Sequence, residues 1–282
     1  MSMSLVRLGG AAGRPVMVVG PSLGTSVVEL WSASVSWLAE DFQVFGWDLP
    51  GHGQHRPTQP SAITISSLAA DVRGAVERVV PGPFHYAGVS VGGAVGLQLA
   101  LDAPSLVVSA SLVCTGARIG TPGGWLERAD LVRAHGTRAV VAGSRDRWFA
   151  PSTSLTGPDR VERLLASLLD VDEEGYAAVC EALAGFDLRD RLAEVAPPVL
   201  AVAGEHDVAT PPDTLAEVAR GVRSGRLVVM PDVAHLAPFE APRRLADLVR
   251  QHARTAVGAT GSSSVDHRGP GAQGLQAAVS HG

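Results

Sequence analysis

Short apolar segments rich in β-branched residues alternate along this chain with longer segments of helical periodicity. Apolar residues spaced three or four positions apart predict helices at Ile65–Val80, Val91–Leu101, Thr214–Val222 and Pro242–Ala256. The short apolar segments predict strands at Val16–Val19, Val44–Trp47, Phe84–Ala87, Val107–Cys114, Val199–Val202 and Leu227–Met230. Such alternation is typical of proteins in which helices cover both faces of a mostly parallel sheet. The sequence therefore predicts an α/β fold.

The alternation stops between about Arg118 and Arg191, where helical segments replace strands. Because an open α/β sheet binds ligands beyond the carboxyl ends of its strands, an insertion leaving the end of Val107–Cys114 would cover that edge. We therefore expect a core of residues 1–117 and 191–256 and a helical cap of residues 118–190. The glycine- and serine-rich segment 257–282 is expected to be a disordered tail.

Composition narrows the possible partners and chemistry. A net charge of −5 argues against nucleic acid as a partner. No apolar run is long enough to cross a membrane and the N-terminus lacks a secretory signal pattern, so we expect a cytoplasmic protein without membrane contact. Cys114 and Cys180 are expected to be reduced and buried. All basic residues are Arg, which excludes catalysis by a lysine Schiff base.

The pentapeptide Gly88–Gly92, Gly-Val-Ser-Val-Gly, stands between a predicted strand and a predicted helix. Gly-x-Ser-x-Gly in that context is the pattern of a nucleophile elbow, a sharp turn that exposes a reactive serine. A second match, Gly20–Gly24, is followed by a loop, at the place where this kind of site supplies its second oxyanion amide. We therefore predict Ser90 as the nucleophile and the backbone N–H groups of Val91 and Leu23 as the oxyanion donors.

A serine nucleophile needs a histidine base, and that histidine needs an acid to hold it in the right tautomer. In folds with this elbow the chain order is serine, acid, histidine, each on a loop after a strand. Asp207 follows the predicted strand Val199–Val202, and His235 follows Leu227–Met230. The order predicts a triad of Ser90, Asp207 and His235.

Other titratable residues lie near these positions in the sequence. Glu205 and Asp232 are alternative acids, each less well placed than Asp207. His206 precedes the final strand and is interpreted as a loop residue, whereas His52 is expected to fix a turn near the site. The chain has no His-Glu-x-x-His or Cys-x-x-Cys spacing, so we expect neither a catalytic metal nor another cofactor.

Several segments together resemble the 3-oxoadipate enol-lactonases of the α/β-hydrolase superfamily. In the core they are Ser22–Thr25, Trp47–Gly53, Gly88–Gly93 and Ala203–Pro212. In the insertion they are Thr115–Pro122, Trp125, Arg147–Pro151, Glu174–Ala178 and Asp187–Asp190. The core segments are common among α/β-hydrolases, whereas the insertion is similar to the cap of this lactonase family. The resemblance covers about Val16 to Ala256.

The resemblance implies hydrolysis of 3-oxoadipate enol-lactone to 3-oxoadipate through a serine acyl-enzyme, in bacterial breakdown of protocatechuate and catechol. A carboxylesterase or another lactonase with the same triad is the first alternative. A non-catalytic ligand receptor on the same fold is the second.

The implied substrate is a small anionic lactone, so the cap should offer an arginine to bind its carboxylate. Arg118 is the first candidate because it leaves the end of the strand Val107–Cys114 on the ligand-binding edge. Trp125 and Trp148 are the candidates to line the pocket, with packing within the cap as the alternative. The alternative arginines are Arg128, Arg133 and Arg138.

Overall fold

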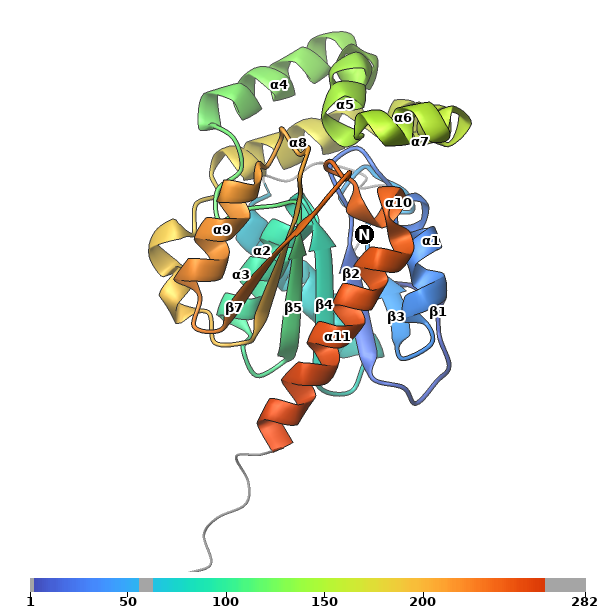
Figure 1. Ribbon diagram of the computed structural model, residues 1–282. Helices are drawn as coiled ribbons and strands as arrows, with labels where there is room; N and C mark the ends of the chain where they lie inside the picture. The colour runs from blue at the N-terminus through green and yellow to red at the C-terminus, as the bar shows by residue number, and fades with distance from the viewer. Residues whose placement is uncertain (1–2, 56–62, 262–282) are drawn as a thin grey trace, which may run out of the picture.

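One seven-stranded sheet organises the protein, whose computed structural model describes residues 3–55 and 63–261 (Figure 1). The strand order is β1-β3-β2-β4-β5-β6-β7; only β1 runs antiparallel to its neighbour, and the other pairs are parallel. The strands are β1 Val6–Gly9, β2 Val16–Gly20, β3 Gln43–Gly46, β4 Phe84–Val89, β5 Val107–Val113, β6 Val199–Gly204 and β7 Gly225–Met230. The six predicted strands correspond to β2–β7, and the predicted α/β class is confirmed.

Helices cover both faces of this sheet. Helix α11 lies in front of the sheet in Figure 1 and packs against α1, while α2 and α3 pack together behind it. Helix α9 packs against β6 and β7. The core helices are α1 Val27–Leu38, α2 Ile65–Val79, α3 Val91–Asp102, α9 Pro212–Gly221, the short α10 Ala237–Glu240 and α11 Pro242–Gly261. The central strands are therefore buried on both sides, as β4 and β6 show along their whole length.

Strand β1 and helix α1 lie outside the predicted set. Strand β1 is a short edge strand of half-buried residues, which produces only a weak alternation signal. Helix α1 begins after Ser26, whose side chain accepts a hydrogen bond from the Glu29 N–H. The Val27 N–H donates instead to Asp48 Oδ1 at 2.7 Å, from the loop after β3. Tertiary contacts thus help to hold the beginning of this helix.

A helical insertion between β5 and β6 lies over the carboxyl ends of the strands (Figure 1). We call it the cap. Its helices are α4 Pro122–His135, α5 Val141–Trp148, α6 Pro151–Thr156, α7 Pro158–Ser167 and α8 Glu173–Ala184, with 3₁₀ segments η1 Thr137–Val140, η2 Leu168–Asp170 and η3 Arg189–Glu194. Helices α4 and α8 pack extensively against each other. The cap therefore covers the edge where parallel sheets bind ligands.

Helix α11 continues to Gly261, beyond the predicted end at Ala256. Residues 257–261 thus belong to this helix, and the expected disorder of the rest of the segment stays a prediction because residues 262–282 lie outside the described residues. Within the described part of the chain, no helix combines the length and apolarity needed to cross a membrane. Cys114 and Cys180 are buried and free, as expected.

Candidate active site

Ser90 lies at the sharp turn between β4 and α3, with φ 54° and ψ −119°. A positive φ is strained for a residue with a side chain, and such strain concentrates at functional sites. The Ser90 N–H donates to Val113 O at 3.0 Å, and the Thr115 hydroxyl donates to Ser90 O at 2.7 Å. The strained backbone is thus held by the neighbouring strand β5 and the residues after it.

The glycines on either side of Ser90 are required by close approach. A Cβ at Gly88 would collide with the carbonyl oxygen of Gly92, one turn further along. A Cβ at Gly92 would collide with the carbonyl oxygen of Pro21, which accepts a hydrogen bond from the Gly92 N–H at 3.0 Å. The pattern of the elbow therefore reflects backbone packing at both glycines.

The two predicted oxyanion donors flank Ser90. Val91 directly follows it as the first residue of α3, and Leu23 lines the same pocket from the loop after β2. Within the described residues neither backbone N–H donates to another protein group. Both amides are thus available to a ligand oxygen, as an oxyanion hole requires.

His52 holds the loop that carries Leu23. Its Nε2 accepts a hydrogen bond from the Gly24 N–H at 3.0 Å, and its Nδ1 lies 2.8 Å from Pro50 O. This pairing needs the neutral ring, with the proton on Nδ1. Burial lowers the pKa of His52 to about 4, which favours the neutral form. His52 therefore fixes a turn near the site. It also holds Gly24, the neighbour of the predicted oxyanion donor Leu23.

Asp207 and His235 are in direct contact at the carboxyl ends of β6 and β7. His235 Nδ1 lies 2.8 Å from Asp207 Oδ2, and both side chains are almost completely buried. The Thr210 hydroxyl donates to the same oxygen at 2.7 Å. Burial alone would raise the pKa of Asp207, but the charge and hydrogen bond of His235 and the bonds of Thr210 outweigh it and lower that pKa. A charged Asp207 keeps the Nδ1 proton in place and leaves His235 Nε2 to act as a base.

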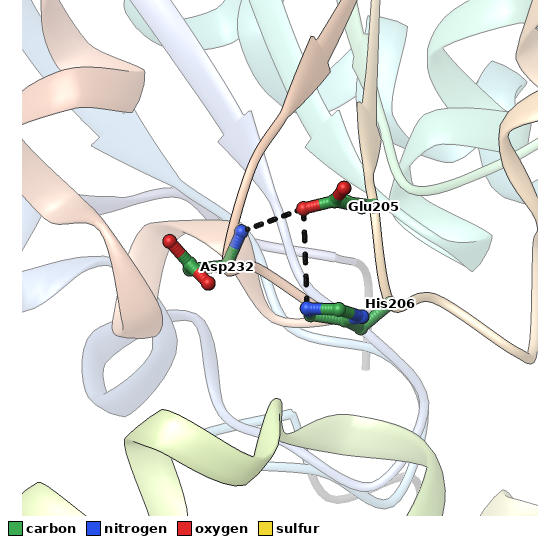
Figure 2. Close-up of side chains that lie close together, drawn as sticks. All are labelled: Glu205, His206 and Asp232. Atoms are coloured by element: carbon green, nitrogen blue, oxygen red, sulfur yellow. Dashed lines mark hydrogen bonds and ion pairs between the residues drawn. The ribbon is translucent and has the colours of Figure 1, made fainter.

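The competing residues Glu205, His206 and Asp232 form a separate cluster on the surface (Figure 2). Glu205 Oε2 accepts from the Asp232 N–H at 3.2 Å and lies 3.9 Å from His206 Nε2. The Glu205 and His206 side chains are 52% and 45% exposed, whereas that of Asp207 is 0% exposed. These three residues carry potential metal-ligand atoms, but water satisfies exposed groups of this kind. Of the acids considered, Asp207 is the one that contacts His235.

A pocket of about 130 Å³ brings Ser90, His235 and Leu23 together beneath the cap. The predicted Trp125 and Trp148 both line it. The remaining lining residues are Ser22, Ile119, Gly120, Arg128, Arg147, Tyr176 and Ala209. This volume is well below the range for drug-sized ligands, so the pocket suits a small substrate.

Two arginines from the cap face this pocket. The pKa of Arg147 is lowered, first by burial and then by the positive charge of Arg128. No Asp or Glu is among the lining residues, and neither arginine belongs to an ion pair in the described part of the chain. Arg128 lies 5.7 Å from the Trp125 ring centre, and the positive charges of both arginines act on the buried Tyr176. The pocket therefore has a positive wall beside Ser90.

The other predicted arginines lie elsewhere. Arg118, the first candidate, is not among the lining residues and instead acts electrostatically on Asp187. Arg133 is bonded to Glu174 and Glu181, each at 2.6 Å, and Arg138 is exposed. Arg147 was not a candidate in the sequence. Its signals there were its position next to Trp148 and its place in the segment Arg147–Pro151, which resembles the lactonase cap.

Comparisons with known proteins bear on the family of this chain. A sequence model of the family described as alpha/beta hydrolase fold matches residues 15–242. A 3-oxoadipate enol-lactonase from Acinetobacter baylyi is 33% identical over 201 residues, 71% of this chain and 74% of the relative. A pimeloyl-[acyl-carrier protein] methyl ester esterase from Methylococcus capsulatus is 34% identical over 227 residues, 77% of this chain and 87% of the relative.

Among solved structures, the enol-lactonase from Burkholderia xenovorans LB400 superimposes with a TM-score of 0.84 at 30% identity. The match covers 89% of this chain and 96% of that one. The similarity thus includes the cap as well as the core.

Proposed function

The chain belongs to the α/β-hydrolase fold family, and on that premise we propose that it is a serine hydrolase that converts 3-oxoadipate enol-lactone to 3-oxoadipate. One observation carries the proposal: Ser90 and His235 share a small pocket with two arginines that have no ion-pair partner among the described residues. The first two residues supply ester-cleaving chemistry, and the arginines supply affinity for an anion.

In the proposed acylation step, His235 Nε2 takes the proton of Ser90 Oγ as that oxygen attacks the lactone carbonyl carbon. The negative charge that develops on the carbonyl oxygen is stabilised by the N–H groups of Leu23 and Val91. The ring C–O bond then breaks, and the leaving oxygen departs as an enolate. The enolate is protonated by the His235 imidazolium, which returns His235 to its neutral form, and the product tautomerises to the ketone while the chain stays attached to Ser90 as an ester.

Deacylation repeats the same steps with water. His235 Nε2 removes a proton from a water molecule, whose oxygen attacks the Ser90 ester. The Ser90 Oγ–C bond breaks, Ser90 recovers its proton from His235, and 3-oxoadipate is released. Asp207 remains charged throughout and stabilises the imidazolium ring in both steps.

Arg128 and Arg147 are the proposed ligands of the substrate carboxylate, in place of Arg118. A guanidinium binds a carboxylate through two parallel N–H···O bonds, and partial burial strengthens that attraction. The pocket volume of about 130 Å³ also favours a compact lactone over an ester with a long acyl chain. The similarity to two enol-lactonases supports the same substrate. The reaction would serve the cytoplasmic degradation of aromatic compounds.

The deciding experiment is a direct assay of the purified protein with 3-oxoadipate enol-lactone, followed by the loss of its ultraviolet absorbance. We expect turnover by the natural chain and a loss of about 10⁶-fold in kcat for Ser90→Ala, as for other serine nucleophiles. Near-normal turnover by Ser90→Ala would overturn the assignment of the nucleophile. Absence of turnover by the natural chain would overturn the substrate.

The alternative of a carboxylesterase or another lactonase has support from the similarity to the pimeloyl-[acyl-carrier protein] methyl ester esterase. A panel of neutral esters distinguishes the two, because an enol-lactonase with a positive pocket should prefer the anionic substrate. A non-catalytic receptor on this fold would not be labelled by a fluorophosphonate at Ser90. Labelling that disappears in His235→Ala would identify an enzyme.

A further inference from the structure

The carboxylate of Glu240 joins the loop of His235 to the cap. Glu240 ends the short helix α10, directly after the histidine loop. Its Oε1 accepts a hydrogen bond from the Ala234 N–H at 2.9 Å. Its Oε2 accepts from the Ala150 N–H at 2.7 Å and from the Thr153 hydroxyl at 2.9 Å. One side chain thus holds the residue before His235 and two residues at the start of α6.

The cap segment fixed in this way forms a wall of the pocket. Arg147 and Trp148, which line the pocket, are separated from Ala150 by Phe149 alone. The Leu236 N–H donates to Trp148 O at 3.3 Å, so the histidine loop and this wall also meet through their backbones. A shift of α6 would therefore move the pocket wall relative to His235.

The Glu240 carboxylate is held by hydrogen bonds and not by a salt bridge. Within the described residues Glu240 belongs to no ion pair, and its side-chain partners are neutral donors. Burial raises the pKa of Glu240, and the bonds from Ala150, Thr153 and Ala234 partly offset that effect. A partly buried carboxylate with no cation beside it costs stability, which its hydrogen bonds must offset.

Both oxygens of Glu240 are needed as acceptors. A glutamine has one acceptor oxygen and one NH₂ donor. In either orientation, the NH₂ of Gln would face a backbone N–H, of Ala234 or of Ala150. Glu240→Gln is therefore nearly identical in shape but loses the hydrogen bond to either the Ala234 N–H or the Ala150 N–H.

We propose that Glu240 is a positioning residue that holds His235 and the Arg147–Trp148 wall of the pocket in register with each other. The proposal rests on the serine-hydrolase function but not on the identity of the lactone. Glu240 is not among the residues that line the pocket; it acts through the Ala234 N–H on one side and through α6 on the other.

The test uses the full chain with two 4-nitrophenyl esters, a neutral acetate and a glutarate half-ester that carries a carboxylate. Glu240→Gln should lower kcat for both esters by about 10- to 100-fold, since small displacements of a base are costly. Its KM for the glutarate should rise, because the arginine wall moves as well. Fluorophosphonate labelling of Ser90 should slow together with kcat.

Thr153→Val tests the cap side of the Glu240 connection separately. It removes a hydrogen bond to Glu240 Oε2 and leaves the bond from the Ala234 N–H in place. It should raise KM for the glutarate by about threefold to tenfold, less than the full value of a hydrogen bond to a charged group because Thr153 acts on the pocket only through Glu240 and α6, and leave kcat for the acetate unchanged. The matched control is Glu162→Gln, which removes an exposed cap carboxylate paired with Arg145. We expect Glu162→Gln to change neither KM for the glutarate nor kcat for the acetate.

Unchanged kcat for the acetate in Glu240→Gln would overturn the proposal. If that variant does not fold, as judged by its melting temperature, Thr153→Val decides alone: an unchanged KM for the glutarate then overturns the proposal. A natural chain that hydrolyses the acetate but not the enol-lactone would overturn the proposed substrate and leave this test intact.

Discussion

The core loops that carry Ser90 and His235 and the inner face of the cap meet at one pocket, but the two sides differ in how their charges are paired. On the core side, Asp207 accepts hydrogen bonds from His235, from the Thr210 hydroxyl, and from the N–H groups of Ala209 and Thr210. On the cap side, Arg128 and Arg147 face the pocket with no carboxylate among the lining residues. On the core side the charge of Asp207 is fully hydrogen-bonded, whereas on the cap side two positive charges have no carboxylate beside them in the pocket.

Arginines on the outer face of the cap are paired with carboxylates, so the lack of such partners is confined to the arginines that face the pocket. Arg133 is paired with Glu174 and Glu181, and Arg145 is paired with Glu162. Arg147 instead has its pKa lowered by burial and by Arg128, so an anion between the two would relieve an unfavourable arrangement. Under the proposed function, the core would therefore supply the reaction and the cap the preference for an anionic substrate.

The largest effect is expected from Asp207→Asn on the core side. Asn cannot hold the His235 proton on Nδ1, so kcat for any ester should fall by about 10⁴-fold. The measurement is kcat for 4-nitrophenyl acetate, with the melting temperature as a check of folding. Glu205→Gln, in the exposed cluster of Figure 2, should leave kcat unchanged. A comparable loss in Glu205→Gln would instead make Glu205 the catalytic acid.

A smaller effect, on binding alone, is expected from the cap side. Arg128→Ala or Arg147→Ala should raise KM for the anionic lactone by about 10- to 100-fold, the value of a hydrogen bond to a charged group. KM for a neutral ester should stay the same. Arg133→Ala is the matched control, because its guanidinium is paired on the outer face. Equal changes in KM for both substrates would mean that the two arginines support the pocket and do not recognise charge.

The smallest expected effect is a pH dependence of the free energy of unfolding, which should arise from His52 in the core. The pKa of His52 is lowered from 6.5 to about 4 by burial, so the unfolded chain takes up a proton before the folded one does. The stability contributed by neutral His52 is present above pH 6.5 and is lost as pH falls towards 4. Between pH 6.5 and 5 this loss should be about 1.5 kcal/mol.

Urea unfolding at a series of pH values measures this effect. His52→Gln retains an acceptor for the Gly24 N–H but cannot titrate, so its stability should depend less on pH in that range. The cap arginines remain protonated there and contribute nothing to the slope. An identical slope in His52→Gln would show that His52 is not the group that titrates.

The sequence predicted the elements whose signals are local. The elbow around Ser90 is encoded by small residues that permit a strained turn, and the strands β2–β7 by runs of apolar residues. Helix α1 was missed because part of what holds its first turn, Asp48 Oδ1 on the Val27 N–H, comes from a distant loop. The predicted helix ended at Ala256 because the residues of α11 beyond it include Gly258, Thr260 and Gly261, which have low helix propensity.

The arginine positions show where sequence reasoning reached its limit. Arg118 stands at the expected edge of the sheet, but its side chain lies outside the pocket, near Asp187. Arg128 and Arg147 come from two cap helices, α4 and α5, whose packing brings them together. No pattern within a single helix distinguishes an arginine that faces the pocket from one that faces solvent beside a glutamate.

The sequence by itself thus determined the α/β fold and a triad hypothesis of Ser90, Asp207 and His235, because each depends on a short motif and on chain order. Tertiary structure alone decided which charges face Ser90 and how Glu240 joins the histidine loop to α6. The physical reason is the distance along the chain over which the interactions act. A turn or a strand is specified by neighbouring residues, whereas the electrostatics of a pocket is specified by side chains that only folding brings together.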